Sequence, residues 1–237
     1  MTTEKTLENI IRIADKIKDG ASAVALMFCE ELIDQLKAEI NARATMRKAE
    51  QNGQKDMLAG ALKILQSAKK GNPIFKKALT APDGSQIITD GFRAVKLFSP
   101  LDLPAHDAAN RYAAEGVAAG IDRIIMQAAQ NRGETIKPLA GDALKNLIAT
   151  QKAEMKARGD KTKIAALDLT PEIRIDACLL IDLLRVLPGA TLITSANKVE
   201  PWRRPIYLKA ENGCGVLLPL FKLLYFSSFI ICALSFE

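Results

Sequence analysis

Apolar residues recur three and four positions apart through the first 70 residues, which is the spacing of amphipathic helices. The pattern predicts helices over residues 4–18, 22–50 and 55–69, with Gly53 as the break between the second and the third. Residues 1–70 are therefore expected to form a helical N-terminal region. In its third helix, the residues expected to share the face on the core are Met57, Ala61, Leu62 and Leu65.

The second of these helices carries a narrow apolar stripe made of Cys29, Ile33, Leu36 and Ile40. The stripe has the spacing of a coiled coil, but it covers too few heptads to establish pairing. Two interpretations stay open, namely packing against its own domain and pairing with another helix.

After residue 70 the apolar residues no longer follow the helical spacing. In residues 77–98, β-favouring runs flank the turn sequence Pro82-Asp83-Gly84, which predicts a hairpin. Asp90-Gly91 interrupts the second run as a bulge or a second turn would. The stretch SPLDLP then leaves the sheet as an extended loop, because each proline disfavours helix at the residue before it. Residues 71–104 are expected to form a hairpin segment.

Residues 105–163 are expected to form a helical insertion. One helix covers 106–130, is started by His106-Asp107 and is closed by residues 131–133; a second covers 140–158. The apolar face of the first is expected at Ile121, Ile124, Ile125 and Ala128. The C-terminal end of the second helix is basic. Two interpretations stay open, namely a solvated helix end and a segment that contacts phosphates. Its candidate DNA contacts are Lys152, Lys156, Arg158, Lys161 and Lys163.

Residues 164–219 predict the order strand, helix, strand, strand, strand. EIRI is the first strand, DACLLIDLLRVL is the helix, and ATLITSA, PIYLKA and CGVLLPL are the remaining strands. Asp176 is the expected N-cap of the helix, since its carboxylate can accept amide protons of the first turn. The face of this helix is expected at Ala177, Leu180, Ile181 and Leu184. The whole pattern indicates an α+β fold.

Two of these segments resemble the bacterial DNA sliding clamp. The first is Thr89-Asp90-Gly91-Phe92-Arg93-Ala94, which is similar to the Thr-Asp-Gly-His-Arg-Leu-Ala segment of clamps. The second is the unit from Ile173 to Pro219. Its order of strand, helix and three strands, and its closing GVLLPL, are similar to the last domain of clamps, which ends in a strand of the type Val-Val-Met-Pro-Met. The resemblance as a whole covers about a third of the chain.

In clamps these segments meet and line a hydrophobic pocket that captures short peptides of polymerases and other replication proteins. The resemblance implies a peptide-binding pocket in which Gly91 lets a backbone approach, Val216 and Leu218 form an apolar floor, and Arg93 makes a polar rim contact. The complete set of candidates is Thr89, Gly91, Phe92, Arg93, Ala94, Val216 and Leu218. An ordinary core would use the same residue types, so that alternative stays open.

The chain also departs from the clamp pattern. Phe92 stands in place of a histidine and Ala94 in place of a leucine, which changes the shape of the implied pocket. The chain is shorter than a three-domain clamp, and its helical stretches have no identified counterpart. A small clamp-like protein of a phage or mobile element best fits this combination of clamp-like segments and unmatched helices. A closed ring would require a homo-oligomer.

Composition narrows the partners and the compartment. The net charge of +6 and pI near 9.1 favour double-stranded DNA as a partner, or else a solvated basic surface without a ligand. Aromatic residues make up only 5%, which argues against stacking platforms for single-stranded bases. The four cysteines form no CxxC pair and there is one histidine, so we predict no metal and no cofactor. A charged N-terminus without a secretory core favours the cytoplasm.

The segment 220–237 is an apolar tail with three open interpretations: a membrane anchor, a buried terminal segment, or a non-native extension from an altered reading frame. Its uninterrupted apolar stretch is shorter than the roughly 20 residues that span a bilayer, so no membrane partner is expected.

The sequence contains no phosphate loop and no nucleophile elbow, and His106 is expected to be an exposed helix cap. We therefore predict no catalytic residues and a non-enzymatic DNA-replication accessory that binds partner peptides. Two alternatives remain: a structural or interaction protein that keeps a clamp-like fold without a DNA function and pairs through its N-terminal helices, and an enzyme whose site leaves no motif. The most useful structural observation is whether residues 89–94 and 216–218 lie side by side, because the clamp-like pocket requires that adjacency.

Overall fold

The computed structural model describes residues 10–11, 23–68, 72–160 and 164–220. The chain divides into two compact units, Met1–Lys55 and Asp56–Glu237. In the first unit, α2 (Ala23–Gln51) confirms the second predicted helix. The first predicted helix, 4–18, lies outside the described residues except for Ile10 and Ile11, which are helical, and most of the apolar tail lies outside them too.

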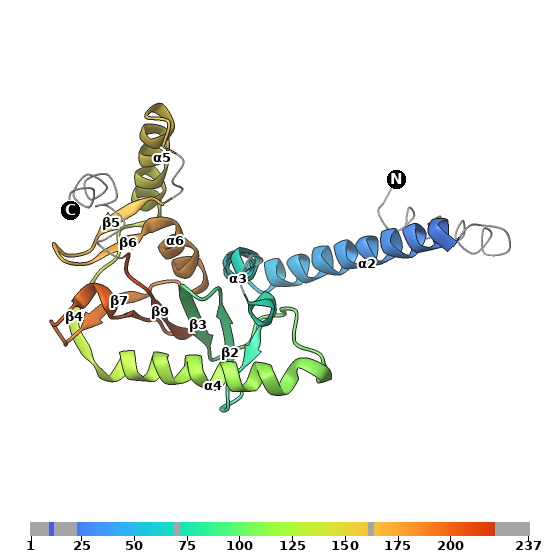
Figure 1. The fold of residues 1–237 in the computed structure, drawn as a ribbon, viewed down its shortest axis with the longest axis horizontal. Helices are drawn as coiled ribbons and strands as arrows, with labels where there is room; N and C mark the ends of the chain where they lie inside the picture. Colours follow the sequence, from blue (N-terminus) through green and yellow to red (C-terminus); the bar gives the residue numbers. More distant parts are fainter. Residues whose placement is uncertain (1–9, 12–22, 69–71, 161–163, 221–237) are drawn as a thin grey trace, which may run out of the picture. The chain divides into compact units, whose positions relative to one another are not determined.

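The second unit is built on a seven-stranded antiparallel sheet (Figure 1). In spatial order its strands are β1 (Leu79–Thr80), β2 (Gln86–Thr89), β3 (Arg93–Leu97), β9 (Gly213–Leu217), β8 (Ile206–Lys209), β7 (Thr191–Ser195) and β4 (Arg132–Ile136). A separate two-stranded sheet contains β5 (Ala166–Asp168) and β6 (Arg174–Asp176). This mixture of helices and antiparallel sheets confirms the predicted α+β class.

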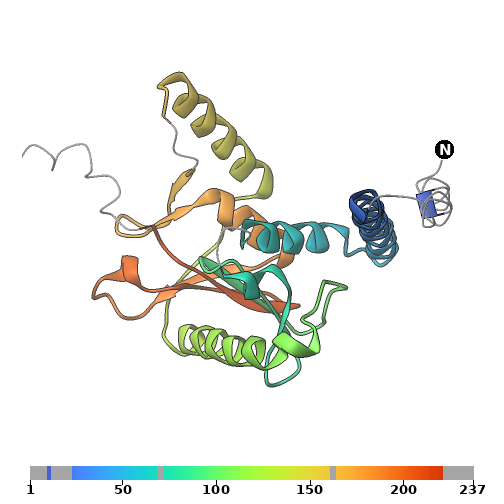
Figure 2. The same ribbon diagram turned by 45° about the vertical axis from the view of Figure 1, so that its right-hand side comes forward.

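Helices cover both faces of the large sheet (Figure 2). The long helix α4 (Ala108–Gln130) lies on one face, and α6 (Ala177–Val186) lies on the other. The helix α3 (Lys55–Ser67) packs beside α6 so closely that a Cβ added at Gly60 would lie 2.9 Å from the Asp182 carbonyl oxygen. On the same side, α5 (Gly141–Ala157) packs against α6. Two short 3-10 helices, Pro73–Lys76 and Pro201–Arg203, complete the described elements.

The sheet is buried on both faces because successive strand residues point to opposite sides. From β3, Lys96 reaches Asp122 of α4, whereas Arg93 reaches the Leu179 carbonyl of α6. All five residues of β3 and all five of β9 are buried. These two central strands therefore form the least exposed part of the sheet.

The second unit repeats one topology twice. A helix followed by three strands occurs as α3–β1–β2–β3 and again as α6–β7–β8–β9, and the two halves meet where β3 pairs with β9. Equivalent hydrogen bonds occur at both ends of this junction. The Leu218 amide donates to the Phe92 carbonyl at 2.9 Å, and the Phe98 amide donates to the Asn212 carbonyl at 3.2 Å. Phe98 therefore occupies, at the opposite end of the sheet, the position that corresponds to Leu218.

Both predicted turns of the hairpin segment are present. The turn at Pro82-Asp83-Gly84 joins β1 to β2, and Asp90-Gly91 forms a second turn, between β2 and β3, rather than a bulge. Asp176 caps α6 by accepting the Cys178 amide at 2.8 Å, as predicted. These features depend on neighbouring residues only, which is why the sequence predicts them.

The predicted core faces of three helices require correction. In α4, Ile124 is largely exposed while Ala114, Ala118 and Ile125 are buried. The other two helices have a different buried face because α3 and α6 pack on each other as well as on their neighbours. In α6 the predicted Ala177 and Leu180 are buried together with Leu183 and Val186, whereas Ile181 and Leu184 are only partly buried. In α3 they are Leu58, Gly60, Ala61, Ile64 and Leu65, whereas Met57 and Leu62 are only partly buried.

The span 105–163 is not wholly helical as predicted. Within it, β4 joins the large sheet beside β7, with Thr135 opposite Ile193. Its sequence RGETI is polar and mostly exposed, so it lacks the apolar alternation that marks a strand. His106 is not an exposed cap either: Asp107 caps α4, and the partly buried imidazole Nε2 lies 2.9 Å from the Ile74 carbonyl oxygen.

Among the residues that the structure describes, no helix combines the length and apolar character required to cross a bilayer.

Candidate functional site

Residues 93–94 and 216–217, from the two segments compared with clamps, lie side by side in the sheet. Strand β3 pairs with β9 in an antiparallel register that places Arg93 opposite Leu217 and Ala94 opposite Val216. The ladder continues past the strand ends through the hydrogen bond from the Leu218 amide to the Phe92 carbonyl. More than a hundred residues separate residues 89–94 from residues 216–218 in the chain, so this adjacency comes from the tertiary fold and not from local structure.

Two exposed apolar side chains lie at this end of the ladder. The side chain of Phe92 is 64% exposed and that of Leu218 is 41% exposed. Gly91 adopts φ of +94°, and an added Cβ there would lie 3.5 Å from the ring of Phe75. Phe75, Gly91, Phe92 and Leu218 are called the β3–β9 surface below. Phe75 was not among the predicted residues, because nothing in its local sequence links it to the Gly91 turn.

Side-chain hydrogen bonds hold the turn that carries Phe92. The Thr89 hydroxyl donates to the Arg93 carbonyl at 2.7 Å and accepts the Gly91 amide at 3.1 Å. The carboxylate oxygen Oδ1 of Asp90 accepts the amides of Phe92 and Arg93 at 3.0 and 3.1 Å. Asp and Thr side chains often hold turns in this way. Thr89 and Asp90 therefore shape the surface from beneath it.

Arg93 lies under the surface and not at the rim where the clamp resemblance led us to expect it. Only 3% of the residue is exposed. Its Nε donates to Asp90 at 3.0 Å, and one terminal nitrogen donates to the Leu179 carbonyl at 2.7 Å and to Asp182 at 3.3 Å. These contacts connect the β2–β3 turn to α6. Arg93 is therefore a positioning residue.

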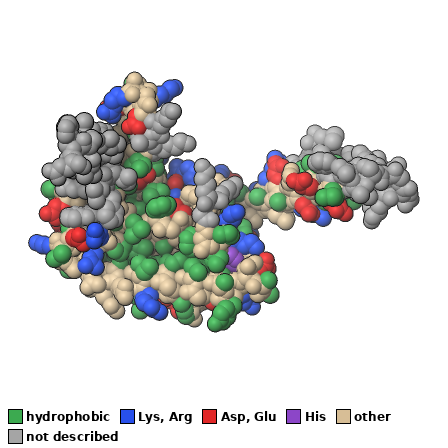
Figure 3. Space-filling model, in the orientation of Figure 1, with side chains coloured by type: hydrophobic (Ala, Val, Ile, Leu, Met, Phe, Trp, Pro, Cys, Tyr) green, Lys and Arg blue, Asp and Glu red, His purple; other side chains and the backbone are tan. Residues whose placement is uncertain are grey.

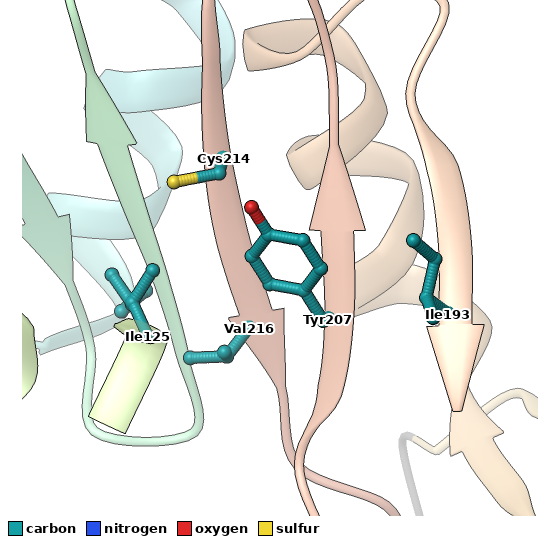
Figure 4. Close-up of a cluster of buried hydrophobic side chains, with 6 residues drawn as sticks. Ile125, Ile193, Tyr207, Cys214 and Val216 are labelled. Carbon is teal, nitrogen blue, oxygen red and sulfur yellow. The ribbon is translucent and has the colours of Figure 1, made fainter. Parts of the chain in front are cut away.

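Ala94 and Val216 point to the opposite face of the sheet and belong to a buried cluster beneath α4 (Figure 4). Val216 is 5% exposed and Ala94 is 4% exposed. The other buried members are Ile125, Ile193, Tyr207 and Cys214. These two candidates serve an ordinary core, as the alternative interpretation of the sequence had it.

The basic candidates lie on a different element. Lys152 and Lys156 are exposed on α5, and exposed Arg158 caps its C-terminal end. Lys and Arg side chains gather at the free end of α5 at the top of Figure 3, while hydrophobic side chains lie over β7, β9 and α6. Lys161 and Lys163 lie outside the described residues. The described part of this segment can present cations to a polyanion.

A charged cluster around the nearly buried Lys96 connects β3 to α4. Lys96 Nζ lies 2.7 Å from both Asp83 and Asp122. Hydrogen bonds from Lys96 and then from Ser85 hold the pKa of the Asp83 carboxyl well below its ordinary range. Burial alone would lower the pKa of Lys96, but the hydrogen bonds to Asp122 and Asp83 outweigh it and raise that pKa. The cluster is a charge-paired structural contact.

The described cysteines are not arranged for nucleophilic or metal chemistry. Cys29, Cys178 and Cys214 are free thiols. Burial raises the pKa of both Cys178 and Cys214, which disfavours the reactive thiolate. Within the described ranges, no three His, Cys, Asp or Glu side chains gather closely enough to hold a metal ion.

A separate cleft of about 270 Å³ lies between β1 and the start of α4. Its polar lining residues are Thr80, His106, Arg111 and Glu115. It does not include any of the clamp-like residues.

No protein-family model, curated protein or solved structure matches this chain. A functional assignment therefore has to come from the chain's own geometry.

Proposed function

We propose that this protein is a non-enzymatic DNA-replication accessory that resembles a sliding clamp and captures short partner peptides on the β3–β9 surface. The observation that carries the proposal is the pairing of β3 with β9, which brings residues 89–94 beside residues 216–218. The clamp resemblance required this adjacency, and neither composition nor local structure would produce it.

The β3–β9 surface has the properties that favour capture of an apolar side chain. Phe92 and Leu218 offer apolar area, and Gly91, with its φ of +94°, forms the turn that precedes Phe92 and packs against the Phe75 ring. The support beneath is rigid, since Arg93 and Asp90 are almost completely buried and hydrogen-bonded. A preorganised surface loses little conformational entropy when a ligand binds, which favours affinity.

The first test measures peptide binding by fluorescence anisotropy. The probe is a fluorescein-labelled octapeptide with an adjacent Leu-Phe pair between polar residues, and its control has serine at both apolar positions. Phe92→Ser and Leu218→Ser should each weaken binding of the Leu-Phe peptide about tenfold, the effect of losing roughly 1.4 kcal/mol of contact. Phe98→Ser is the matched control, because Phe98 is 58% exposed and lies at the opposite end of β3.

Three outcomes would contradict this part of the proposal. They are no saturable binding of the Leu-Phe peptide, equal binding of the serine peptide, and an equal loss of affinity in the Phe98 variant.

We further propose that the exposed cations at the end of α5 contact the phosphates of duplex DNA. The net charge of +6 favours association with a polyanion, although it does not single out a site. Met155 and Leu144 are buried, so α5 is anchored on one side while Lys152 and Lys156 face solvent. Such contacts release counterions and make the affinity fall steeply with salt.

The DNA part is tested with a labelled duplex of mixed sequence at several salt concentrations. Replacing both Lys152 and Lys156 with alanine should reduce the slope of log affinity against log salt by about 2, since each phosphate contact contributes about 0.9. The control is the double replacement of Lys198 and Lys209, two exposed lysines outside α5. Absence of binding at low salt, or an equal slope change in the control, would reject the α5 contact.

A further inference from the structure

The apolar stripe of α2 has no role in the proposed peptide surface. Cys29, Ile33, Leu36 and Ile40 are each partly buried, whereas Glu30 and most other neighbours are exposed. Their spacing alternates between three and four residues, which places Ile33 and Ile40 at heptad a positions and Cys29 and Leu36 at d positions. The helix is 29 residues long, so it extends beyond the stripe at both ends.

We propose that this stripe is a homodimer interface, in which α2 packs against α2 of a second copy as an antiparallel two-stranded coiled coil. In this register Ile33 lies opposite Leu36 of the second copy, and Cys29 lies opposite Ile40. The same stripe faces itself, so the interface is closed and has two-fold symmetry.

The basic residues that follow the stripe decide against a parallel pair. Arg43 and Arg47 continue the d and a positions of the same heptad pattern. A parallel in-register dimer would bring each of them against the identical arginine of the second copy, and like charges in a seam are destabilising. The antiparallel arrangement moves the arginines of the two copies to opposite ends of the seam. Arg43 keeps its ion pair with Glu39 there.

The charges beside the seam favour the same orientation. Glu30 and Lys37 both fall at heptad e positions, and e positions face each other in an antiparallel pair. Each Glu30 would then meet Lys37 of the second copy, and symmetry makes this contact twice. In the parallel pair Lys37 would instead meet Leu32, which offers it no charge partner. The described contact of Lys37, with Asp34 at 4.0 Å, is exposed and long enough to be replaced.

The alternative to a second copy is a partner within the same chain. The helix predicted at residues 4–18 carries its own apolar face, which is the other candidate to cover the stripe. The charge pattern favours a second α2, because Glu30 and Lys37 would then pair and the arginines at positions 43 and 47 would stay apart. The molecular mass decides between them directly.

Sedimentation equilibrium of the full chain tests the interface. We expect a concentration-dependent dimer for the wild type, and a rise in the dissociation constant of at least about a hundredfold for Ile33→Asp, since a charge is buried in two equivalent layers. The control is Met27→Asp on the same helix, where the residue is 68% exposed and outside the stripe. A monomeric wild type, or equal dissociation in both variants, overturns the proposal.

Charge reversal tests the orientation. Glu30→Lys and Lys37→Glu should each weaken the dimer about fivefold, because each creates two like-charge contacts. The double variant should restore the wild-type dissociation constant. Failure of the double variant to recover rules out the antiparallel contact between these two residues.

Oxidative cross-linking gives an independent readout. In a background with Cys178→Ser and Cys232→Ser, the Ile40→Cys variant should form covalent dimers through Cys29, and the parent with isoleucine at position 40 should not. Efficient cross-linking of that parent through Cys29 would mean that Cys29 faces its own copy, and would establish the parallel pair instead. This measurement does not depend on the peptide surface, so it can fail without affecting the proposed function.

Discussion

Replacing Arg93 with methionine is expected to lower the free energy of unfolding of the second unit by about 3–5 kcal/mol. The guanidinium contacts Asp90 and Asp182, and both side chains of the Arg93–Asp90 pair are only 2% exposed. Removing the cation leaves the Asp90 carboxylate buried without its charge partner, and the Leu179 carbonyl also loses a donor. An uncompensated buried charge costs far more than the pair contributes.

Denaturant unfolding, followed by the fluorescence of the single tryptophan, Trp202, measures this loss. The midpoint should fall while the slope stays constant, which indicates a stability change without a change in the area exposed. The matched control is Arg174→Met, because Arg174 pairs with Asp168 in an exposed contact, where the expected loss is about 1 kcal/mol or less. A loss of the same size in both variants would mean that the buried Arg93 contacts contribute no more to stability than an exposed ion pair does.

A second substitution separates buried charge from lost packing. The double variant Arg93→Met with Asp90→Asn keeps the Oδ1 acceptor that holds the turn but removes the negative charge. About half of the lost stability should return, since pairs of buried ions tolerate joint neutralisation. No recovery would show that packing around the guanidinium stem accounts for the effect.

The elements that the sequence predicted are those determined by neighbouring residues. Asp176 caps α6 and Pro82-Asp83-Gly84 forms a turn because each depends on a side chain and the backbone beside it. The strand β4 could not be predicted in this way. It is polar and exposed, and it becomes a strand only through its pairing with β7, far away in the chain.

The residues of the candidate site also differ in whether local sequence or tertiary packing determines their position. The resemblance identified Gly91, Phe92 and Leu218, which lie on the surface, but it also selected buried residues of the same strands. The burial of Arg93 depends on Asp182, a residue of α6 that no local pattern connects to the hairpin. Which face of a strand meets a helix is decided by tertiary packing, so the sequence alone could not separate the surface residues from their support.

The replacement Gly215→Ala is expected to cost about 2–4 kcal/mol, because it forces apart the two strands on which the candidate site depends. A Cβ at Gly215 would lie 2.6 Å from the Ala94 carbonyl oxygen and 3.3 Å from Leu187 of the α6 C-cap. Backbone of the neighbouring strand cannot move away as a flexible side chain can. The strands would separate or the ladder would shift.

The control is Gly120→Ala in α4, where an added Cβ meets nothing within 4 Å. Because glycine disfavours helix interiors, this variant should be more stable by about 0.5–1 kcal/mol. The opposite signs make the comparison independent of any general effect of the glycine-to-alanine change. Denaturant unfolding measures both variants, and amide hydrogen exchange of Leu218 reports its bond to Phe92. If Gly215→Ala loses stability and Leu218 exchanges faster, the β3–β9 ladder is what holds the surface together. Unchanged stability would mean that the ladder tolerates the added methyl group, and the surface would then need another support.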